Sequence, residues 1–338
     1  MKRGFAVVGV GMWGQIHIET YLSDPNSELI AICDKNEERI KQIAEKYDIR
    51  KFTTEYSNIL EDPEVEAISI ATPDFAHKEI AVNAAKAGKH ILVEKPLAIT
   101  VQDCEEIIRT ANTMNVKLMV DFHNRFNPPF VKVKESVENG EIGIPSLLNI
   151  RLNLTRDFPL ENLKWAEKSN VAFFMGSHAI DLTCWILNDT ACEVYAVSRS
   201  GVLSKAGKNI QDFYYSIISF NKGTIAIVEN SWVLPYNSPT TVDFKLELIG
   251  EKGAAYVDAS HNRCIEKYVE GKVTYPNVLI FPFSPEQGCG FAVDSIKHFI
   301  NCVVKDCEPS ISGYDGLVVT KIIEKIIESS NSGIQVKI

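Results

Sequence analysis

The sequence predicts an α/β protein of two domains: a doubly wound parallel sheet in residues 1–121, and an α+β domain with a large, mainly antiparallel open sheet in residues 122–338. Three observations lead to this fold class. The length of 338 residues suits two domains of ordinary size. The first part alternates short apolar runs with amphipathic helical patterns, and the second part is dominated by long β-type stretches.

Strands of the first domain are predicted at five apolar runs, residues 5–10, 29–33, 67–71, 90–93 and 116–120. These runs lack regular polar alternation, so we expect both faces of their sheet to be covered. Helical patterns lie between them, for example at residues 37–47 and 77–87, and Gly88 ends the second of these. Strands that are separated by helices indicate a parallel sheet with helices on both faces.

The turn-rich residues 126–129 introduce the second domain. We expect a helix at 130–139 and strands at 147–154, 214–220, 224–231, 244–249 and 254–257. The short turn Asn221-Lys222-Gly223 predicts a hairpin between two of these strands. Further helices are expected at 177–187 and, closing the chain, at 291–304, so the second domain is interpreted as α+β.

The charge balance excludes one class of partner. The chain carries 35 Lys and Arg against 44 Asp and Glu, which gives a net charge of −9. We expect no nucleic-acid partner, because phosphate binding needs a basic surface. No run of about 18 apolar residues occurs, so we expect no membrane span. The short apolar run near the start lacks the cleavage pattern of a signal peptide.

The eight cysteines are scattered, with no Cys-x-x-Cys pair and no metal-ligand spacing. We interpret them as reduced, mostly buried thiols of a cytoplasmic protein. The same spacing leads us to expect no metal.

Residues 9–14, Gly9-Val10-Gly11-Met12-Trp13-Gly14, fit the pattern G-x-G-x-x-G. The pattern is weak by itself and also fits a plain strand-to-helix turn, but here it follows the first strand and opens a helix. Gly9 permits the tight turn, Gly11 lets the backbone approach a pyrophosphate, and Gly14 lets helix and strand pack closely. Free N–H groups at the helix start bind the anion, so we predict a dinucleotide site over this loop.

Asp34 ends the second strand, at the position where a carboxylate accepts hydrogen bonds from the adenosine ribose hydroxyls. A 2′-phosphate would be repelled there, so NAD is favoured over NADP. Lys35 lies beside it and partly offsets the repulsion. The alternative role for Asp34 is that of a helix N-cap.

Polar side chains also follow the third and fourth strands. Ala71-Thr72-Pro73 closes the third strand, with His77 in the helix behind it, and Glu94-Lys95-Pro96 closes the fourth. The carboxyl ends of strands line the ligand crevice of an open α/β sheet. We therefore expect the cofactor to be bound also by Ala71, Thr72, Pro73, His77, Glu94 and Lys95.

These motifs make the chain similar to the Gfo/Idh/MocA family of NAD(P)-dependent oxidoreductases, and the resemblance covers nearly the whole chain. The glycine loop, the two strand-end motifs and Arg125-Phe126-Asn127-Pro128 occur in the order and spacing of the family. Gly176-Ser177-His178 with Asp181 follows, and residues 248–253 look like the sheet hairpin of the family. The resemblance implies an NAD-binding Rossmann domain over 1–121 and a substrate-binding and oligomerisation domain over 122–338.

The resemblance also implies two catalytic residues. Lys95 looks like the active-site lysine, which contacts the substrate hydroxyl and the nicotinamide ribose. His178 looks like the catalytic histidine, which exchanges the hydroxyl proton during hydride transfer. Oxidation of an alcohol needs such a base, and a histidine titrates near neutrality. A cationic Lys95 would stabilise the developing alkoxide.

One position departs from the family pattern. Many dehydrogenases of the family carry an Asp four residues before the histidine, where this chain has Phe174. Either His178 and Lys95 suffice, or Asp181 or a substrate group assists, or proton transfer has been lost. Asp181 follows His178 by three residues on the same helical face, where it can orient the imidazole or make a structural hydrogen bond.

The remaining substrate contacts, Asp181 among them, are weaker predictions. Arg125 belongs to the motif His123-Asn124-Arg125, where the family often shows an Asn and two Arg, so a basic contact is missing here. Trp165, Trp232 and Tyr236 can stack on a sugar ring, although aromatic residues in strands more often belong to the core. Arg156 can meet a carboxylate or phosphate.

We predict an NAD-dependent oxidoreductase that acts on a hydroxyl of a sugar, a polyol or a sugar derivative. Two alternatives stay open: an NAD-dependent, redox-neutral glycosidase on the same fold, and a non-catalytic NAD-binding sensor, which Phe174 supports. An antiparallel sheet with one uncovered face favours a partner. The resemblance implies a homodimer or homotetramer built through that sheet.

Overall fold

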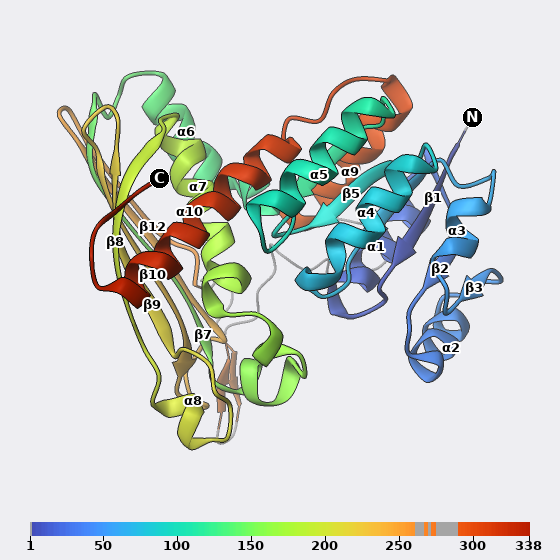
Figure 1. Ribbon diagram of the computed structural model, residues 1–338, viewed down its shortest axis with the longest axis horizontal. Coiled ribbons are helices and arrows are strands. Elements are labelled where there is room, and N and C mark those ends of the chain that lie inside the picture. The colour runs from blue at the N-terminus through green and yellow to red at the C-terminus, as the bar shows by residue number, and fades with distance from the viewer. Residues whose placement is uncertain (1, 261–266, 270–271, 275–289) are drawn as a thin grey trace. The chain divides into compact units, whose positions relative to one another are not determined.

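The computed structural model describes residues 2–260, 267–269, 272–274 and 290–338 (Figure 1). The chain forms two compact units. Unit 1 holds the residues up to His123 and a later segment that ends at Leu317. Unit 2 begins at Asn124 and includes the chain again from Val318 to the C-terminus. Two of the eight cysteines, Cys264 and Cys289, lie outside the described residues.

Unit 1 is built on a six-stranded parallel sheet in the order β3-β2-β1-β4-β5-β6. Its strands are β1 (Arg3–Val8), β2 (Ser27–Cys33), β3 (Phe52–Thr53), β4 (Ala67–Ile70), β5 (His90–Glu94) and β6 (Leu118–Asp121). The chain adds strands outward from β1 and then returns to place β4 on the other side of it. The doubly wound parallel sheet expected from the sequence is confirmed, and its switch point lies between β1 and β4.

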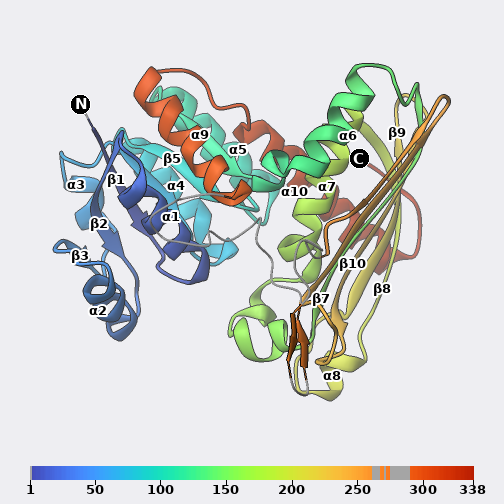
Figure 2. The same cartoon turned by 180° about the vertical axis from the view of Figure 1, so that it is seen from behind.

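Helices cover both faces of this sheet. They are α1 (Met12–Ser23), α2 (Glu37–Lys46), α3 (Ser57–Glu61), α4 (His77–Lys86), α5 (Val101–Thr113) and α9 (Phe291–Lys305). Figures 1 and 2 show α4 and α5 on one face, and α1 and α9 on the other. Phe5 of β1 is fully buried between the ring of Tyr21, 4.6 Å away, and that of Phe299 from α9, at 6.3 Å.

Unit 2 is built on a seven-stranded sheet in the order β12-β11-β7-β10-β9-β8-β15. Its strands are β7 (Pro145–Thr155), β8 (Ala191–Arg199), β9 (Phe213–Phe220), β10 (Ile225–Leu234), β11 (Val242–Gly250), β12 (Ala254–Asp258) and β15 (Val336–Lys337). All neighbouring strands are antiparallel except β7 and β10. The predicted mainly antiparallel sheet is confirmed, as is the hairpin at residues 221–223, where Gly223 has a φ of +95°. A short antiparallel hairpin, β13 (Lys267–Val269) with β14 (Lys272–Thr274), forms a separate two-stranded sheet.

Helices lie along one face of the second sheet, as Figure 2 shows. They are α6 (Pro128–Glu138), α7 (Ser177–Leu187) and α10 (Gly313–Ser332), whose residues from Val318 onward count with unit 2, and a short helix α8 (Val202–Lys205) follows β8. Leu148, Ile150, Leu152 and Leu154 of β7 are buried on the helix-facing side. The alternate residues of the strands point to the opposite, open face. This arrangement places α7, which carries His178, firmly against the sheet.

Two of the longer elements differ from the expectation. The helix α10 closes the chain before β15, whereas the sequence predicted the closing helix at 291–304. Its β-branched run, Val318-Val319 and the following isoleucines, has strand propensity, but Val319, Ile322, Ile323 and Ile326 are buried with helical spacing, so packing decides. Strand β8 was not expected either. Of the described cysteines, Cys33, Cys104 and Cys302 are buried and Cys307 is exposed.

Candidate active site

The glycine loop joins β1 to α1 in unit 1, and its three glycines meet different neighbours. Gly9 has a φ of +95°, and a Cβ there would lie 2.5 Å from the carbonyl oxygen of Ala71. A Cβ on Gly14 would lie 1.9 Å from the carbonyl oxygen of Gly9, whereas one on Gly11 would meet nothing within 4 Å. Packing therefore requires the first and third glycines, and the second leaves open space at the start of α1.

The N-terminus of α1 is available to an anion. The N-cap is Gly11, without a side-chain cap, and the first turn contains no acidic residue. Met12 is 57% exposed, and Trp13 stacks on His123 with ring centroids 4.7 Å apart. The N–H groups of this turn have the position that a pyrophosphate needs, so the loop fits the predicted dinucleotide.

The carboxylate of Asp34 ties the glycine loop to the end of β2. It accepts hydrogen bonds from the backbone N–H of Val10, at 3.0 Å, and of Asn36, at 2.8 Å. The N-cap of α2 is Asn36, whose side chain accepts from the N–H of Arg39, so the alternative role of Asp34 as N-cap is excluded. Arg39 also pairs with Asp34 at 3.4 Å. Lys35 is exposed.

His77 holds the ends of β4 and β5 together. Its Nδ1 lies 2.7 Å from the carbonyl oxygen of Pro96, and its Nε2 lies 2.9 Å from that of Thr72. The ring is 1% exposed, so it positions the two loops that were predicted to bind the cofactor. Within the described part of the chain, the buried hydroxyl of Thr72 has no hydrogen-bond partner.

Lys95 directly follows β5 and is 9% exposed. Burial lowers the pKa of its ammonium group, and the negative charges of Glu94, Asp74 and Asp121 oppose that shift. Glu94 is 5% exposed and lies 3.2 Å from Nε2 of His17. Glu94 was predicted to bind the cofactor; its contacts instead favour a role inside unit 1.

His178 lies in the first turn of α7 in unit 2 and is 7% exposed. The Nδ2 of Asn124 lies 3.2 Å from its Nδ1. An amide N–H can only donate, so Nδ1 accepts and the proton of a neutral ring resides on Nε2. A side-chain amide thus orients the imidazole that the sequence singled out, and Asn124 is a partner that the sequence reasoning did not identify.

Arg125 and Asp181 form a buried ion pair. Nε and one terminal nitrogen of Arg125 donate to Asp181, with a shortest distance of 2.6 Å, and Asp181 is 1% exposed. Both residues were predicted as substrate contacts. Their pairing favours a positioning role, in which the connector after β6 is anchored to the helix that carries His178.

Phe174, at the position of the missing carboxylate, belongs to a cluster of aromatic rings. Its centroid lies 5.9 Å from Trp165, 6.2 Å from Phe158 and 6.4 Å from Trp232. Phe174 is part of a π-helical turn, Ala172–Gly176, that runs directly into α7. The wider π-helical turn shifts Phe174 from the position that an α-helix would give it relative to His178.

The other aromatic candidates separate by burial. Trp232 is fully buried and donates its indole N–H to the carbonyl oxygen of Gln211 at 2.7 Å, so it belongs to the core. Trp165 is half-buried. Tyr236 is 58% exposed, and the guanidinium of Arg156 lies 5.7 Å from its ring centroid.

Comparison with known proteins agrees with this geometry. Residues 3–122 match the model of an oxidoreductase family with an NAD-binding Rossmann fold, and residues 130–256 match the GFO/IDH/MocA C-terminal domain. The uncharacterized oxidoreductase YrbE of Bacillus subtilis is 30% identical over 98% of this chain and 95% of its own length. Myo-inositol 2-dehydrogenase of Thermotoga maritima is 28% identical over 96% of each chain. The crystal structure of a probable dehydrogenase from Thermotoga maritima superimposes with a TM-score of 0.85, at 27% identity, over 99% of this chain and 98% of that one.

The fold and the glycine loop define an NAD-binding oxidoreductase. The chain belongs to the Gfo/Idh/MocA family, as its resemblance to that family implied. The empty space at Gly11, the uncapped start of α1 and the carboxylate of Asp34 are the features that fit NAD. The part of the chain that the structure describes contains no helix long and apolar enough to span a membrane.

Proposed function

We propose that the protein is a dehydrogenase for a ring hydroxyl of a cyclic polyol of the inositol class. The observation that carries this proposal is the pairing of a complete NAD loop with two buried proton-handling groups, Lys95 and His178, in a chain 28% identical to a myo-inositol 2-dehydrogenase. The relatives give no support to the glycosidase or the sensor.

Lys95 is proposed to bind the reacting hydroxyl oxygen through its ammonium group. A fixed cation at that oxygen stabilises the negative charge that develops as the proton leaves. Burial strengthens this interaction because little water screens it. Bound NAD supplies the hydride acceptor.

His178 is proposed to take the hydroxyl proton. The Asn124 amide holds the ring whichever nitrogen carries the proton, because it can turn and present its oxygen to an Nδ1–H. A carboxylate at this point would accept only from the N–H form. We infer that Asn124 takes over the orienting role for which the family pattern uses an Asp at the position of Phe174.

The aromatic cluster is proposed to bind the substrate ring. Phe174 and Trp165 are only partly buried, and aromatic rings can pack against the C–H groups of a polyol ring. Exposed Tyr236 with Arg156 is a second, weaker candidate surface.

The test is the absorbance of NADH when the protein and NAD are mixed with inositols, open-chain polyols, aldoses and nucleotide sugars. We expect turnover with inositols and about 10³-fold slower turnover after Lys95→Ala. Turnover only with an aldose would overturn the substrate class, and hydrolysis of a chromogenic glycoside with catalytic NAD would favour the glycosidase. The Glu37→Gln protein, changed at an exposed carboxylate, is the matched control.

We also propose that the open face of the second sheet binds a second copy of the chain. Tyr195 and Val197 of β8 lie opposite Ile217 and Tyr215 of β9, and all four are at least 40% exposed. A monomer seldom leaves such a continuous apolar strip in water. The strip lies at one side of the open face.

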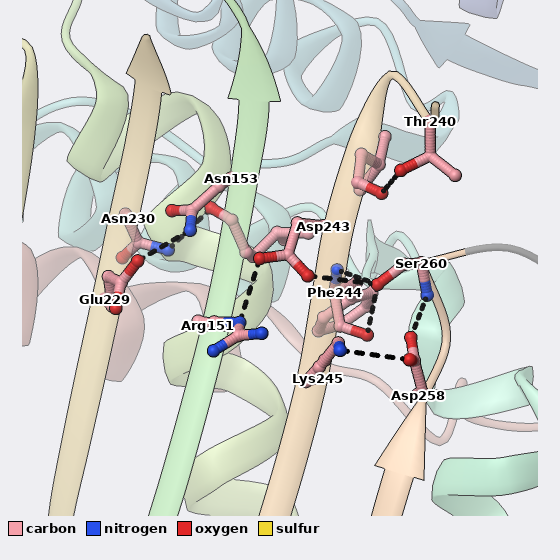
Figure 3. Close-up of polar contacts among 12 residues, drawn as sticks. Arg151, Asn153, Glu229, Asn230, Thr240, Asp243, Phe244, Lys245, Asp258 and Ser260 are labelled. Atoms are coloured by element: carbon pink, nitrogen blue, oxygen red, sulfur yellow. Dashed lines mark hydrogen bonds and ion pairs between the residues drawn. The ribbon is translucent and has the colours of Figure 1, made fainter. Parts of the chain in front are cut away.

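Charged groups of both signs occupy the other side of the same face (Figure 3). Arg151 pairs with Asp243 at 2.9 Å and Lys245 with Asp258 at 3.1 Å. A twofold axis can set the apolar strips together and place opposite charges across the interface. Ile217→Lys should therefore lower the mass in light scattering, whereas Leu22→Lys, at an exposed position of α1, should not. A monomeric mass for the unaltered protein would refute the proposal. The cytoplasmic location expected from the cysteines stays a prediction.

A further inference from the structure

A group of buried polar side chains lies inside unit 1, and one of its members, Glu94, directly precedes Lys95 in the chain. His17 of α1, Glu94 of β5 and Asp121 of β6 are 0%, 5% and 1% exposed. The Nε2 of His17 lies 3.2 Å from Glu94 and 3.7 Å from Asp121. Residues from three elements thus meet at one imidazole, and we call them the His17 cluster.

Hydroxyl groups complete the His17 cluster. Ser69 of β4 lies 2.9 Å from Nδ1 of His17 and 2.5 Å from the hydroxyl of Tyr21. Burial raises the pKa of Tyr21 above its usual value, so Tyr21 keeps its proton and donates to Ser69, which in turn can donate to Nδ1. Nε2–H then faces the two carboxylates. On the other side, Ser295 of α9 donates to Asp121 at 2.5 Å.

The three residues also offer ligand atoms within 4.8 Å of one another, an arrangement that a metal ion could use. Both ring nitrogens of His17 already have hydrogen-bond partners, however, at Ser69 and Glu94. Proton sharing accounts for the cluster without a metal.

Three carboxylates oppose the effect of burial on the pKa of Lys95: Glu94 of β5, Asp121 of β6 and Asp74 in the turn after β4. Two imidazoles, His17 and His123, interact with Glu94. Burial lowers the pKa of His123 to about 4, so this ring is uncharged at neutral pH. A buried ammonium group without carboxylates nearby would lose its proton.

We propose that the His17 cluster is a positioning device for the counter-ions of Lys95: the imidazole of His17 holds Glu94, the residue before Lys95 in the chain, and reaches Asp121 from the same nitrogen atom. His17 is therefore a positioning residue. The role of the cluster in catalysis rests on the proposed function, but its effect on the charge of Lys95 does not.

The two carboxylates differ in what holds their charge. Burial alone would raise the pKa of Glu94, but the hydrogen bond and proximity of His17 outweigh it and leave that pKa below its usual value. Burial and the nearby charge of Glu94 raise the pKa of Asp121 to about 7. Because the two carboxyl groups lie at the same imidazole nitrogen, their protonation states depend on each other. Above about pH 7 the cluster therefore gains one negative charge, which strengthens the hold on the Lys95 ammonium.

The direct test measures the protonation of Lys95 itself. The protein is labelled with ¹³C-lysine, the Lys95 side chain is assigned by its absence in Lys95→Arg, and its signal is followed against pH. Glu94→Gln should lower the pKa of Lys95 by about one unit or more, the effect of losing a close opposite charge. Asp121→Asn should lower it by a smaller amount. Glu37→Gln, at an exposed carboxylate of the same unit, is the matched control and should leave it unchanged.

Activity provides a second readout. If the protein turns over an inositol, Glu94→Gln should move the alkaline limb of kcat/KM to lower pH by the same amount as the NMR shift. Ser295→Ala keeps all three charged groups and serves if Glu94→Gln fails to fold; it should alter the titration of Asp121 and hence that of Lys95.

An unchanged Lys95 titration in folded Asp121→Asn and Ser295→Ala proteins would overturn the proposal. Stoichiometric zinc bound by the unaltered protein and lost in Asp121→Asn would overturn it as well, in favour of a metal site. Absence of turnover with every polyol would instead count against the proposed function, since the NMR titration does not depend on substrate.

Discussion

The two residues proposed for catalysis are held by different physical means. Lys95 in unit 1 interacts with the carboxylates of Glu94, Asp74 and Asp121, so charge is balanced by charge. His178 in unit 2 is held by the uncharged amide of Asn124, while the nearest carboxylate in the helix, Asp181, is paired with Arg125. A group that must stay ionised is thus placed among opposite charges, and a group that must change its protonation is placed against a partner that suits both states.

The largest expected effect comes from removing either group. Lys95→Ala and His178→Ala should each lower kcat by about 10³-fold, within the range for general acid–base groups. NAD affinity, measured by tryptophan fluorescence, should remain within about threefold, since neither change alters the glycine loop. A variant that keeps most of its turnover would remove that residue from the mechanism.

The buried ion pair of Arg125 with Asp181 is expected to stabilise unit 2, and removing its cation tests this. Arg125→Met leaves Asp181 buried without its cation, and we expect about 3–5 kcal/mol lower free energy of unfolding in urea. Lys132→Met breaks the exposed pair of Lys132 with Glu135 and should leave the urea midpoint in place. Equal midpoints for both variants would show that the pair does not anchor α7.

Replacing the amide partner of His178 by a carboxylate would place a negative charge beside the catalytic group of unit 2, as carboxylates interact with Lys95 in unit 1. In Asn124→Asp a carboxylate favours the imidazolium, so the pKa of His178 should rise by about one unit. Oxidation needs the ring unprotonated, so the acidic limb of kcat/KM should move to higher pH. Asn124→Ala should lower kcat without that shift. A shift of the acidic limb of kcat/KM in Phe174→Asp but not in Asn124→Asp would contradict this. It would show that a carboxylate at position 174, and not one at position 124, interacts with His178.

The smallest effect is expected at the cofactor. Asp34→Asn keeps the acceptor for the N–H of Val10 but removes the charge. NAD should bind about tenfold more weakly, the usual loss when a hydrogen bond to a charged group is weakened, and NADP should gain relative to NAD. Equilibrium dialysis with both cofactors measures the ratio, with Lys35→Ala at the exposed neighbouring position as control. An unchanged ratio of NAD to NADP affinity would indicate that Arg39, and not Asp34, determines which cofactor is bound.

Local sequence explains much of what the structure contains. The glycine loop, the predicted strands of the parallel sheet and the hairpin at 221–223 follow from short-range patterns, because turn geometry and apolar periodicity are set by neighbouring residues. The 291–304 helix was also predicted, within one residue of α9. The contact of this helix with the parallel sheet was not predicted. An amphipathic pattern shows that a helix has an apolar face, but it does not show which sheet that face packs against.

The hydrogen-bond networks around the two proposed catalytic residues could not be predicted from the sequence, for the same reason. His17, Asp121 and Ser295 lie in separate helices and strands, and no spacing in the chain relates them. Asn124 was visible as part of a motif, but its bond to His178 joins residues 54 positions apart. Likewise, Asp181 follows His178 on one helical face, but its carboxylate accepts hydrogen bonds from Arg125, and the spacing of the residues did not predict this pairing.

The sequence by itself determined the class of protein, the NAD loop and the identity of the two residues proposed for catalysis, because each is written in a contiguous motif. The tertiary structure decided what surrounds those residues: carboxylates at Lys95, an amide at His178 and aromatic rings at Phe174. The physical reason is that burial and charge depend on side chains brought together from distant segments, and these surroundings set which groups hold a proton.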